Sequence, residues 1–256
     1  TVLTDTSLAL HPMTMNGQFA NDLIFSFVHI GLIEEISKLL PVLFVGRFFK
    51  VVNEPVDLVI YGSLSALGFA TMENALYFSR FGLDIAFGRF LISTIMHMAM
   101  TSLVCSAWAW ARFSRGARPF PAIIASLAAA ACVHGLFDFF ILGPDKELSR
   151  LAFFVFYAMA LFYGWTIHRC LNQSPFFKDA LSSSSRLENI SLIATASIAV
   201  FAAAYLYDHF RFSTQIANER LGWGMIGSLV NFSVVVGALG RFTVLRKART
   251  LRLTHL

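Results

Sequence analysis

Charged residues are scarce in this sequence of 256 residues. Aspartate, glutamate, lysine and arginine make up 14% of it, and 57% is hydrophobic. Because a soluble domain usually carries about 25% charged residues, this composition excludes an ordinary soluble protein and predicts an all-α, polytopic membrane protein. The net charge of +5 is better explained by basic residues that anchor one side of a membrane than by a nucleic-acid partner, so we expect no nucleic acid to bind.

Cysteines are equally few, and a secretion signal is not evident. Cys105, Cys132 and Cys170 lie in or at the ends of apolar segments without a paired spacing, which predicts neither a disulfide framework nor a cysteine metal site. Residues 1–22 lack the basic start and the short apolar core of a signal peptide. Since the sequence starts at Thr1 without methionine, we expect a truncated or processed start.

Two common hydrolase motifs are also lacking. The sequence contains no Gly-x-Ser-x-Gly segment and no His-Glu-x-x-His segment. The first motif carries the nucleophile of many serine hydrolases, and the second binds zinc in many metalloproteases. The sequence therefore disfavours an ordinary serine hydrolase and an ordinary zincin.

Seven apolar segments are present, and their lengths suit membrane-spanning helices. The breaks between them contain helix-boundary residues, such as Asn53-Glu54-Pro55 and Gly82, and comparable breaks occur over 114–119 and 143–145. A longer break over 170–189 is expected to be a surface loop. The seven segments lie at about 23–49, 56–79, 89–112, 119–142, 149–169, 190–207 and 222–245.

The distribution of lysine and arginine predicts how these segments are oriented, because cytoplasmic ends of membrane-spanning helices carry the excess of both residues. One side holds the larger set, which is Arg47, Lys50, Arg112, Arg115, Arg118, Arg169, Lys178, Arg186, Arg241, Arg246, Lys247, Arg249 and Arg252. The other side holds the smaller set, which is Arg80, Arg89, Lys146, Arg150, Arg211 and Arg220. We therefore expect the N-terminus outside and the C-terminus in the cytoplasm.

Three ionisable residues, Glu34, Glu35 and Lys38, interrupt the middle of the first apolar segment. A charge at the bilayer centre costs roughly 2.5–3.5 kcal/mol on insertion scales. On a helix, Lys38 lies three and four residues beyond the two glutamates, so its ammonium can reach either carboxylate. One lysine neutralises one glutamate, and the surplus acid indicates chemistry. The alternative interpretation is a structural ion pair that fixes helix packing.

Further costly polar residues lie in the next three segments. Glu73 is in the second, His97 is in the third, and His134 and Asp138 share one helix face in the fourth. Given the predicted orientation and a rise of about 1.5 Å per residue, these side chains and Glu34 lie roughly 9–17 Å below the outer surface. Four antiparallel segments therefore place their polar groups at a common depth.

Such a cluster must face the bundle interior or a wet cavity, and it contains what amide hydrolysis requires. A glutamate in an apolar site can take a proton from water. A neighbouring imidazole can position that water or protonate the leaving amine, and other donors can stabilise the oxyanion. A proton- or ion-coupled transporter is an alternative, because buried Glu, His and Asp also form proton relays, and a non-catalytic receptor or scaffold is a third interpretation.

The polar segments resemble the motifs of the PrsW intramembrane proteases, distant relatives of the CAAX prenyl-protease group. Residues 34–38 match a Glu-Glu-x-x-Lys signature, residues 68–77 resemble a Gly-Phe-Ala-x-x-Glu-Asn-x-x-Tyr stretch, and His97 and residues 134–138 resemble later histidine motifs. The resemblance covers roughly 25–142. It implies cleavage of a single-pass membrane protein near the outer face of a prokaryotic cell membrane, with anti-sigma factors as the best-known substrate class.

The resemblance implies roles for the residues of the first and third segments. Glu34 is the expected general base. Glu35 pairs with Lys38 or shares the work of the base. His97 is expected to hold the water beside the glutamate.

The fourth segment departs from the CAAX relatives. Their last histidine is followed by Asn or Asp and is thought to face the oxyanion. His134 can do the same, but Asp138 as an anion cannot, so we expect Asp138 to orient His134. Asn74 is a candidate replacement oxyanion donor. Glu73 either takes part in catalysis or holds Lys38 or another helix in place.

Metal dependence is the main chemical alternative. A catalytic zinc with three protein ligands and an open position could be held by Glu73, His97, His134 and Asp138. We expect no metal or other cofactor, because the adjacent glutamates with a lysine suit carboxylate catalysis better than ligation.

The expected partners are a membrane-protein substrate and the lipid bilayer; no oligomeric state is predicted. The predicted organisation is an extracytoplasmic tail over 1–22, a four-helix catalytic core over 23–142, three scaffold helices over 143–246 and a basic cytoplasmic tail over 247–256.

Overall fold

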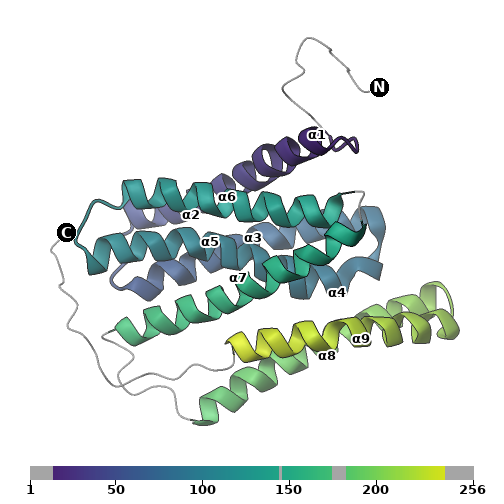
Figure 1. Cartoon of the computed structure of the whole chain (residues 1–256). Helices are drawn as coiled ribbons and strands as arrows, with labels where there is room; N and C mark the ends of the chain where they lie inside the picture. Colours follow the sequence, from purple (N-terminus) through teal and green to yellow (C-terminus); the bar gives the residue numbers. More distant parts are fainter. Residues whose placement is uncertain (1–13, 144–145, 175–182, 240–256) are drawn as a thin grey trace.

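A computed structural model describes residues 14–143, 146–174 and 183–239 of the chain (Figure 1). Within these ranges the chain forms seven helical segments and no strand, which confirms the predicted all-α helical bundle. The first segment is one continuous helix made of α1 (Phe19–Ile24), the π-helical η2 (Phe25–Leu32) and α2 (Ile33–Phe48). The second is α3 (Pro55–Phe81).

The third segment also changes its helical geometry along its length. It consists of the 3₁₀ turn η3 (Leu83–Ile85), α4 (Ala86–Gly88), the π-helical η4 (Arg89–Ser93), α5 (Thr94–Ala109) and the π-helical η5 (Trp110–Ser114). The remaining segments are α6 (Phe120–Leu142), α7 (Lys146–Gln173), α8 (Ser183–Arg211) and α9 (Thr214–Leu239). The surface loop expected over 170–189 is shorter than predicted, because α7 extends to Gln173 and α8 begins at Ser183. Residues 144, 145 and 240–256, on which a predicted break and the predicted basic tail fall, lie outside the described residues.

Local sequence explains where α3 begins and ends. Pro55 occupies the first helical turn, where its missing N–H is not needed. Glu54 and Asp57 form a capping box, in which the Asp57 carboxylate accepts the backbone N–H of Glu54 at 3.0 Å. Gly82 ends the helix with a φ of 77°, a left-handed conformation that favours glycine. The predicted boundaries at 53–55 and at Gly82 are therefore confirmed.

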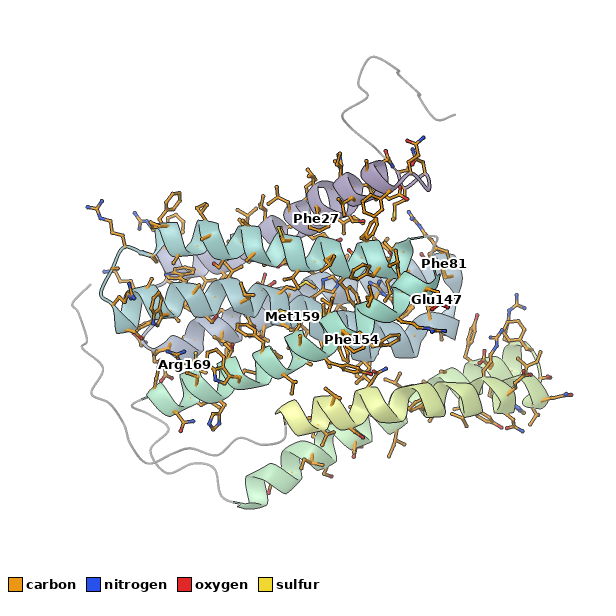
Figure 2. All side chains as sticks on the ribbon, viewed as in Figure 1. Phe27, Phe81, Glu147, Phe154, Met159 and Arg169 are labelled. Carbon is orange, nitrogen blue, oxygen red and sulfur yellow. The ribbon has the colours of Figure 1, made fainter. Side chains whose placement is uncertain are left out.

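Five helices are long and apolar enough to cross a membrane, as far as the described residues go. They are Pro55–Phe81, Arg89–Ser114, Phe120–Leu142, Glu147–Gln173 and Ile190–Arg211. Large apolar side chains cover their outer surfaces, among them Leu64, Ile124, Phe154 and Ile198, and Figure 2 shows such side chains projecting from the ribbon on all visible sides. The chain is an integral membrane protein. That the first and last helical segments also cross the membrane stays a prediction.

The core lies between the first helix and α3, α5, α6 and α7. Its fully buried members include Leu58, Met100, Val104 and Phe156. Helices α8 and α9 pack on each other, and α9 also packs on α7, so this pair lies beside the bundle (Figure 1). The polar residues of the first four segments therefore face an interior that α7 helps to close.

The first helix and α6 approach each other at two glycines. A Cβ atom at Gly31 would lie 2.5 Å from the carbonyl oxygen of Ala131, and one at Gly135 would lie 2.6 Å from the Cα atom of Phe27. Small residues allow such backbone contact between membrane helices. The contact positions the start of α2, with its two glutamates, directly against the turn of α6 that carries His134.

Candidate active site

Lys38 lies at the centre of the buried polar cluster. Its Nζ is 3.1 Å from Glu34 Oε2 and 2.9 Å from Glu35 Oε1, both on the same helix. It is also 2.7 Å from Nδ1 of His97 on α5. The ammonium and the Glu35 side chain are both 0% exposed. The structure therefore places Lys38 between both glutamates rather than with one of them.

The two glutamates differ in their surroundings. Glu35 Oε1 contacts Lys38 and lies 2.9 Å from Nδ1 of His134, while its Oε2 accepts the Thr101 hydroxyl at 3.1 Å. Both Glu35 oxygens are thus engaged. Glu34 has a side chain that is 17% exposed, and among the described residues its contacts to Lys38, His97 and His134 all involve Oε2. Of the two glutamates, Glu34 is therefore the one that keeps a carboxylate oxygen available to accept a further hydrogen bond.

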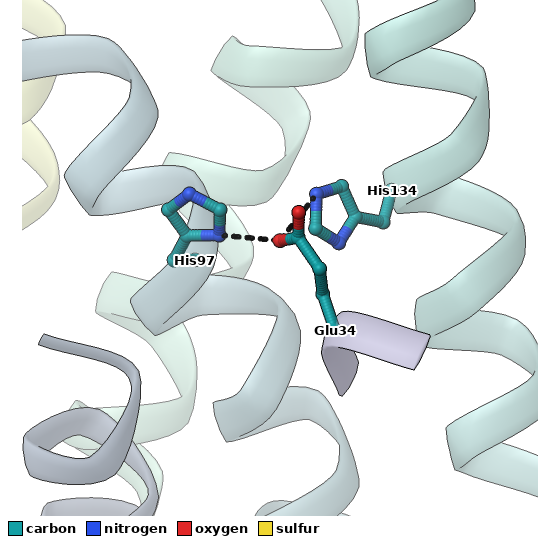
Figure 3. Close-up of side chains that lie close together, drawn as sticks. All are labelled: Glu34, His97 and His134. Carbon is teal, nitrogen blue, oxygen red and sulfur yellow. Dashed lines mark ion pairs between the residues drawn. The ribbon is translucent and has the colours of Figure 1, made fainter. Parts of the chain in front are cut away.

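The carboxylate of Glu34 lies between the two imidazoles (Figure 3). Its Oε2 is 3.8 Å from Nδ1 of His97 and 3.6 Å from Nε2 of His134. The two rings meet edge to face, with centroids 5.3 Å apart. Three helices, the first segment, α5 and α6, therefore contribute one group each to a single point.

A further carboxylate lies beside each imidazole, at the far nitrogen of His97 but at the same nitrogen of His134 that faces Glu34. Glu73 Oε2 on α3 is 2.9 Å from Nε2 of His97. Asp138 Oδ2 is 3.3 Å from Nε2 of His134, one turn along α6. Both carboxylates can orient the ring they contact, as we predicted for Asp138. The five residues predicted as catalytic, together with Lys38 and Glu73, form one continuous network.

A cavity of about 670 Å³ opens on this network. Its lining includes Glu34, Glu73, His97, His134 and Asp138. Apolar side chains from η2, η3, η4, α5 and α6 form the rest of the wall. The combination of an apolar wall with a few convergent polar groups is typical of a ligand or substrate site.

The structure also brings in residues to which the sequence assigned no role. Arg89 on η4 binds Glu73 and also donates from Nε to Asn74 Oδ1 at 2.8 Å. Asn74, predicted as an oxyanion donor, uses its Nδ2 on the Thr94 hydroxyl at 3.3 Å. Its amide is therefore directed to η4 and α5, and Asn74 is not among the residues that line the cavity. Thr101 could have been found by its spacing from His97, but no sequence pattern connects Arg89 with Glu73.

Charge in the described part of the network is unbalanced. Four carboxylates, those of Glu34, Glu35, Glu73 and Asp138, face two permanent cations, Lys38 and Arg89. In a low-dielectric interior an unpaired charge is costly. Additional protons on the imidazoles, or a bound cation, would offset the excess. The same excess disfavours an anionic ligand.

Glu34, His97 and His134 could also hold a metal ion, because one donor atom from each lies within 4.8 Å of the others. Two imidazoles and a carboxylate form a donor set of catalytic zinc sites. The second nitrogen of each ring faces a carboxylate, Glu73 for His97 and Glu35 for His134, as metal-bound histidines usually do. This donor group differs from the zinc set predicted from the sequence, which contained Glu73 and Asp138 but not Glu34.

Fold and site together define a polytopic helical membrane protein with a buried glutamate–histidine centre. The profile of the family described as "PrsW family intramembrane metalloprotease" matches residues 1–166. Since this match covers more than half of the chain and includes the whole network, the chain belongs to the PrsW family.

Three bacterial relatives carry the description "Protease PrsW". The protein of Halalkalibacterium halodurans is 36% identical over 34% of this chain and 40% of its own length. That of Geobacillus kaustophilus is 27% identical over 52% of this chain and 59% of its own length. That of Bacillus subtilis is 30% identical over 51% of this chain and 61% of its own length. The matches thus span about half the length of these relatives. No solved structure matches the chain significantly.

Proposed function

We propose that this chain is an intramembrane endopeptidase in which Glu34 activates the water that attacks the scissile carbonyl. The observation that carries the proposal is the position of Glu34 Oε2 between Nδ1 of His97 and Nε2 of His134, at 3.8 and 3.6 Å, on the wall of the cavity. A water molecule beside Glu34 has a carboxylate to accept its proton and Nε2 of His134 to hold it. Both nitrogens of His97 are already engaged, by Lys38 and by Glu73.

Glu35 serves this scheme as a positioning residue. Its two oxygens are occupied by Lys38, His134 and Thr101, and its side chain is 0% exposed. A carboxylate with three donors and no access to the cavity is a poor general base. Glu35 instead fixes the ring of His134, while Lys38 fixes the ring of His97.

The proposed reaction is hydrolysis of one peptide bond by one water molecule. Glu34 takes a proton from water, and the oxygen attacks the carbonyl carbon. The tetrahedral intermediate collapses when the C–N bond breaks, and the leaving nitrogen receives a proton from Glu34 or from His134. Asp138, 3.3 Å from Nε2 of His134, holds that ring and stabilises its charged form.

We propose a single-pass membrane protein as the substrate, of the kind represented by anti-sigma factors, cleaved near the extracytoplasmic face. The cavity is lined in part by η2, by η4 and by the C-terminal ends of α3 and α6. With a cytoplasmic C-terminus these ends lie toward the extracytoplasmic face, which supports this location. The excess of lysine and arginine at the opposite ends of the helices supports that orientation.

The test is co-expression with candidate single-pass proteins, comparing the wild type with Glu34→Gln and His134→Ala. We expect both variants to abolish cleavage while expression and folding persist, because each removes a group that holds or activates the water. Arg150→Gln, a change in an ion pair whose two side chains are 74% exposed, is the matched control and should cleave normally. Full activity of both site variants would rule the assignment out.

A zinc-dependent form of the same protease is the second candidate, favoured by the donor group of Glu34, His97 and His134. These residues would hold the ion, and zinc would supply a water of lowered pKa and a Lewis acid for the carbonyl. Lys38 Nζ, 2.7 Å from His97 Nδ1, would have to release that nitrogen. Elemental analysis of the purified protein decides: stoichiometric zinc that is lost in His134→Ala supports this form, and full activity of metal-free protein after chelation supports the first.

A further inference from the structure

Three residues of α3 hold the side chain of Arg89. Its Nη2 lies 2.5 Å from Glu73 Oε2, and its Nε donates to Asn74 Oδ1 at 2.8 Å. Its guanidinium also stacks over the ring of Tyr77, 3.9 Å from the centroid. Glu73, Asn74 and Tyr77 follow one another on one face of α3 at helical spacing. These three residues, here called the arginine cradle, fix both the position and the plane of the guanidinium.

The cradled guanidinium still has donors to offer. Among the described residues, Arg89 hydrogen bonds only through Nε and Nη2, and Nη1 is left without an acceptor. An arginine carries five N–H donors in a rigid fork. Arg89 is also one of the residues that line the cavity, and its side chain is 17% exposed. A held cation with spare donors on a cavity wall is arranged to bind a ligand.

Arg89 is directly coupled to the proposed catalytic centre. Glu73 Oε2 accepts from Arg89 Nη2 and also lies 2.9 Å from Nε2 of His97, and the other nitrogen of that ring faces Glu34. The guanidinium is therefore one carboxylate and one imidazole away from the general base. A substrate segment lying in the cavity can contact both.

We propose that Arg89 is a substrate-binding residue that donates through Nη1 to a backbone carbonyl oxygen of the unwound substrate beside the scissile bond. Glu73, Asn74 and Tyr77 act as its positioning residues. This inference rests on the proposed peptidase function. A helix that enters the site must unwind before its peptide bonds can be attacked, and each freed carbonyl in a membrane interior is costly unless a donor meets it.

A neutral carbonyl suits this position better than a carboxylate. Glu73 already compensates the charge of Arg89, and the cavity wall also carries Glu34 and Asp138. A further anion would be repelled by these groups. The site therefore selects an uncharged peptide segment, and an acidic residue next to the scissile bond is predicted to impair cleavage.

The experiment uses the full-length protein in proteoliposomes and a single-pass protein whose cleavage depends on Glu34. A contact made equally in the ground state and the transition state raises KM and leaves kcat unchanged. For Arg89→Gln we expect KM to rise roughly 10-fold or more, as for loss of a hydrogen bond to a charged group, and kcat to fall as well, because Glu73 loses its cation and also holds His97. Arg89→Lys keeps a cation beside Glu73 but loses the fork, so its kcat should stay within about 3-fold of the wild type while KM stays raised.

Two further variants separate binding from folding. Asn74→Ala removes one cradle contact and should raise KM several-fold, and guanidinium added to Arg89→Ala should restore cleavage, which a structural role would not do. The matched control is again Arg150→Gln, whose guanidinium also pairs with a glutamate but lies on an exposed surface. If Arg89→Lys and Asn74→Ala fold and keep the KM of the wild type while Glu34→Gln is inactive, the inference about Arg89 is wrong and the proposed function is unaffected. An active Glu34→Gln would instead overturn the proposed function.

Discussion

Replacing Lys38 by methionine is the most stringent test of the buried network. The ammonium is 0% exposed and lies within 3.1 Å of an oxygen of Glu34 and of Glu35 and within 2.7 Å of Nδ1 of His97. Methionine has a similar length and no charge. The substitution therefore removes the cation while leaving little empty space.

The expected loss of stability follows from the contacts that Glu35 keeps after the substitution. Glu35 is also 0% exposed, so without Lys38 its charge keeps only the imidazole of His134 and the hydroxyl of Thr101. Removing one partner of a buried pair typically destabilises by about 3–5 kcal/mol, because the other charge stays buried without compensation. Changing Glu35 to glutamine as well removes that charge. The double variant Lys38→Met/Glu35→Gln should therefore regain most of the loss.

The measurement is reversible unfolding in mixed detergent micelles, arranged as a double-mutant cycle. The control is Arg150→Gln, in an ion pair of 3.0 Å whose side chains are both 74% exposed, and here we expect a change within about 1 kcal/mol. If Lys38→Met costs as little as the control, or if the effects of Lys38→Met and Glu35→Gln simply add, the network is not electrostatically coupled and the reasoning is wrong.

Two further predictions concern packing and orientation. Gly135→Ala should destabilise the protein by about 1–3 kcal/mol and reduce cleavage, because its Cβ would lie 2.6 Å from the Cα atom of Phe27; Gly222→Ala, which meets nothing within 4 Å, is the control, and equal stability of both variants would contradict the close helix contact. A green fluorescent protein fused to the C-terminus should fluoresce and an alkaline phosphatase fused there should stay inactive, as for a cytoplasmic end; the reverse pattern would place the cavity at the cytoplasmic face.

The fold was largely predictable because hydrophobic segments and helix-boundary residues act locally. Glu54, Pro55 and Gly82 mark ends of helices through their own backbone preferences, and no distant contact is needed to recognise them. The long break over 170–189 was misjudged for the opposite reason. Ser183 to Ser185 are weak helix formers, yet they form the first turn of the 29-residue α8, because extending an existing helix costs much less than starting one.

The site was predictable where spacing along one helix determines contact. Glu34, Glu35 and Lys38 meet because i,i+3 and i,i+4 residues share a helix face, and the same rule joins His134 with Asp138.

Contacts between helices were less accessible to sequence reasoning. Arg89 was counted only as a basic residue at the outer end of a helix, whereas it binds Glu73 and Asn74 across two helices. That contact depends on how η4 turns relative to α3, and no periodicity within either segment encodes this angle. The sequence indicates that Tyr77 shares a helix face with Glu73, because it lies four residues beyond it. It does not indicate that Arg89 contacts both residues.

The adjacent glutamates are best understood as a division of two incompatible demands. A carboxylate that holds a buried lysine and an imidazole in place must keep its oxygens engaged, as Glu35 does. A carboxylate that takes a proton from water, as we propose for Glu34, must reach the cavity and keep an oxygen available, and Glu34 meets both conditions. One side chain cannot meet both demands at once. Because neighbouring residues on a helix point in directions about 100° apart, consecutive glutamates place one carboxylate in the core and the other at the wall of the cavity, and Lys38 below them binds both.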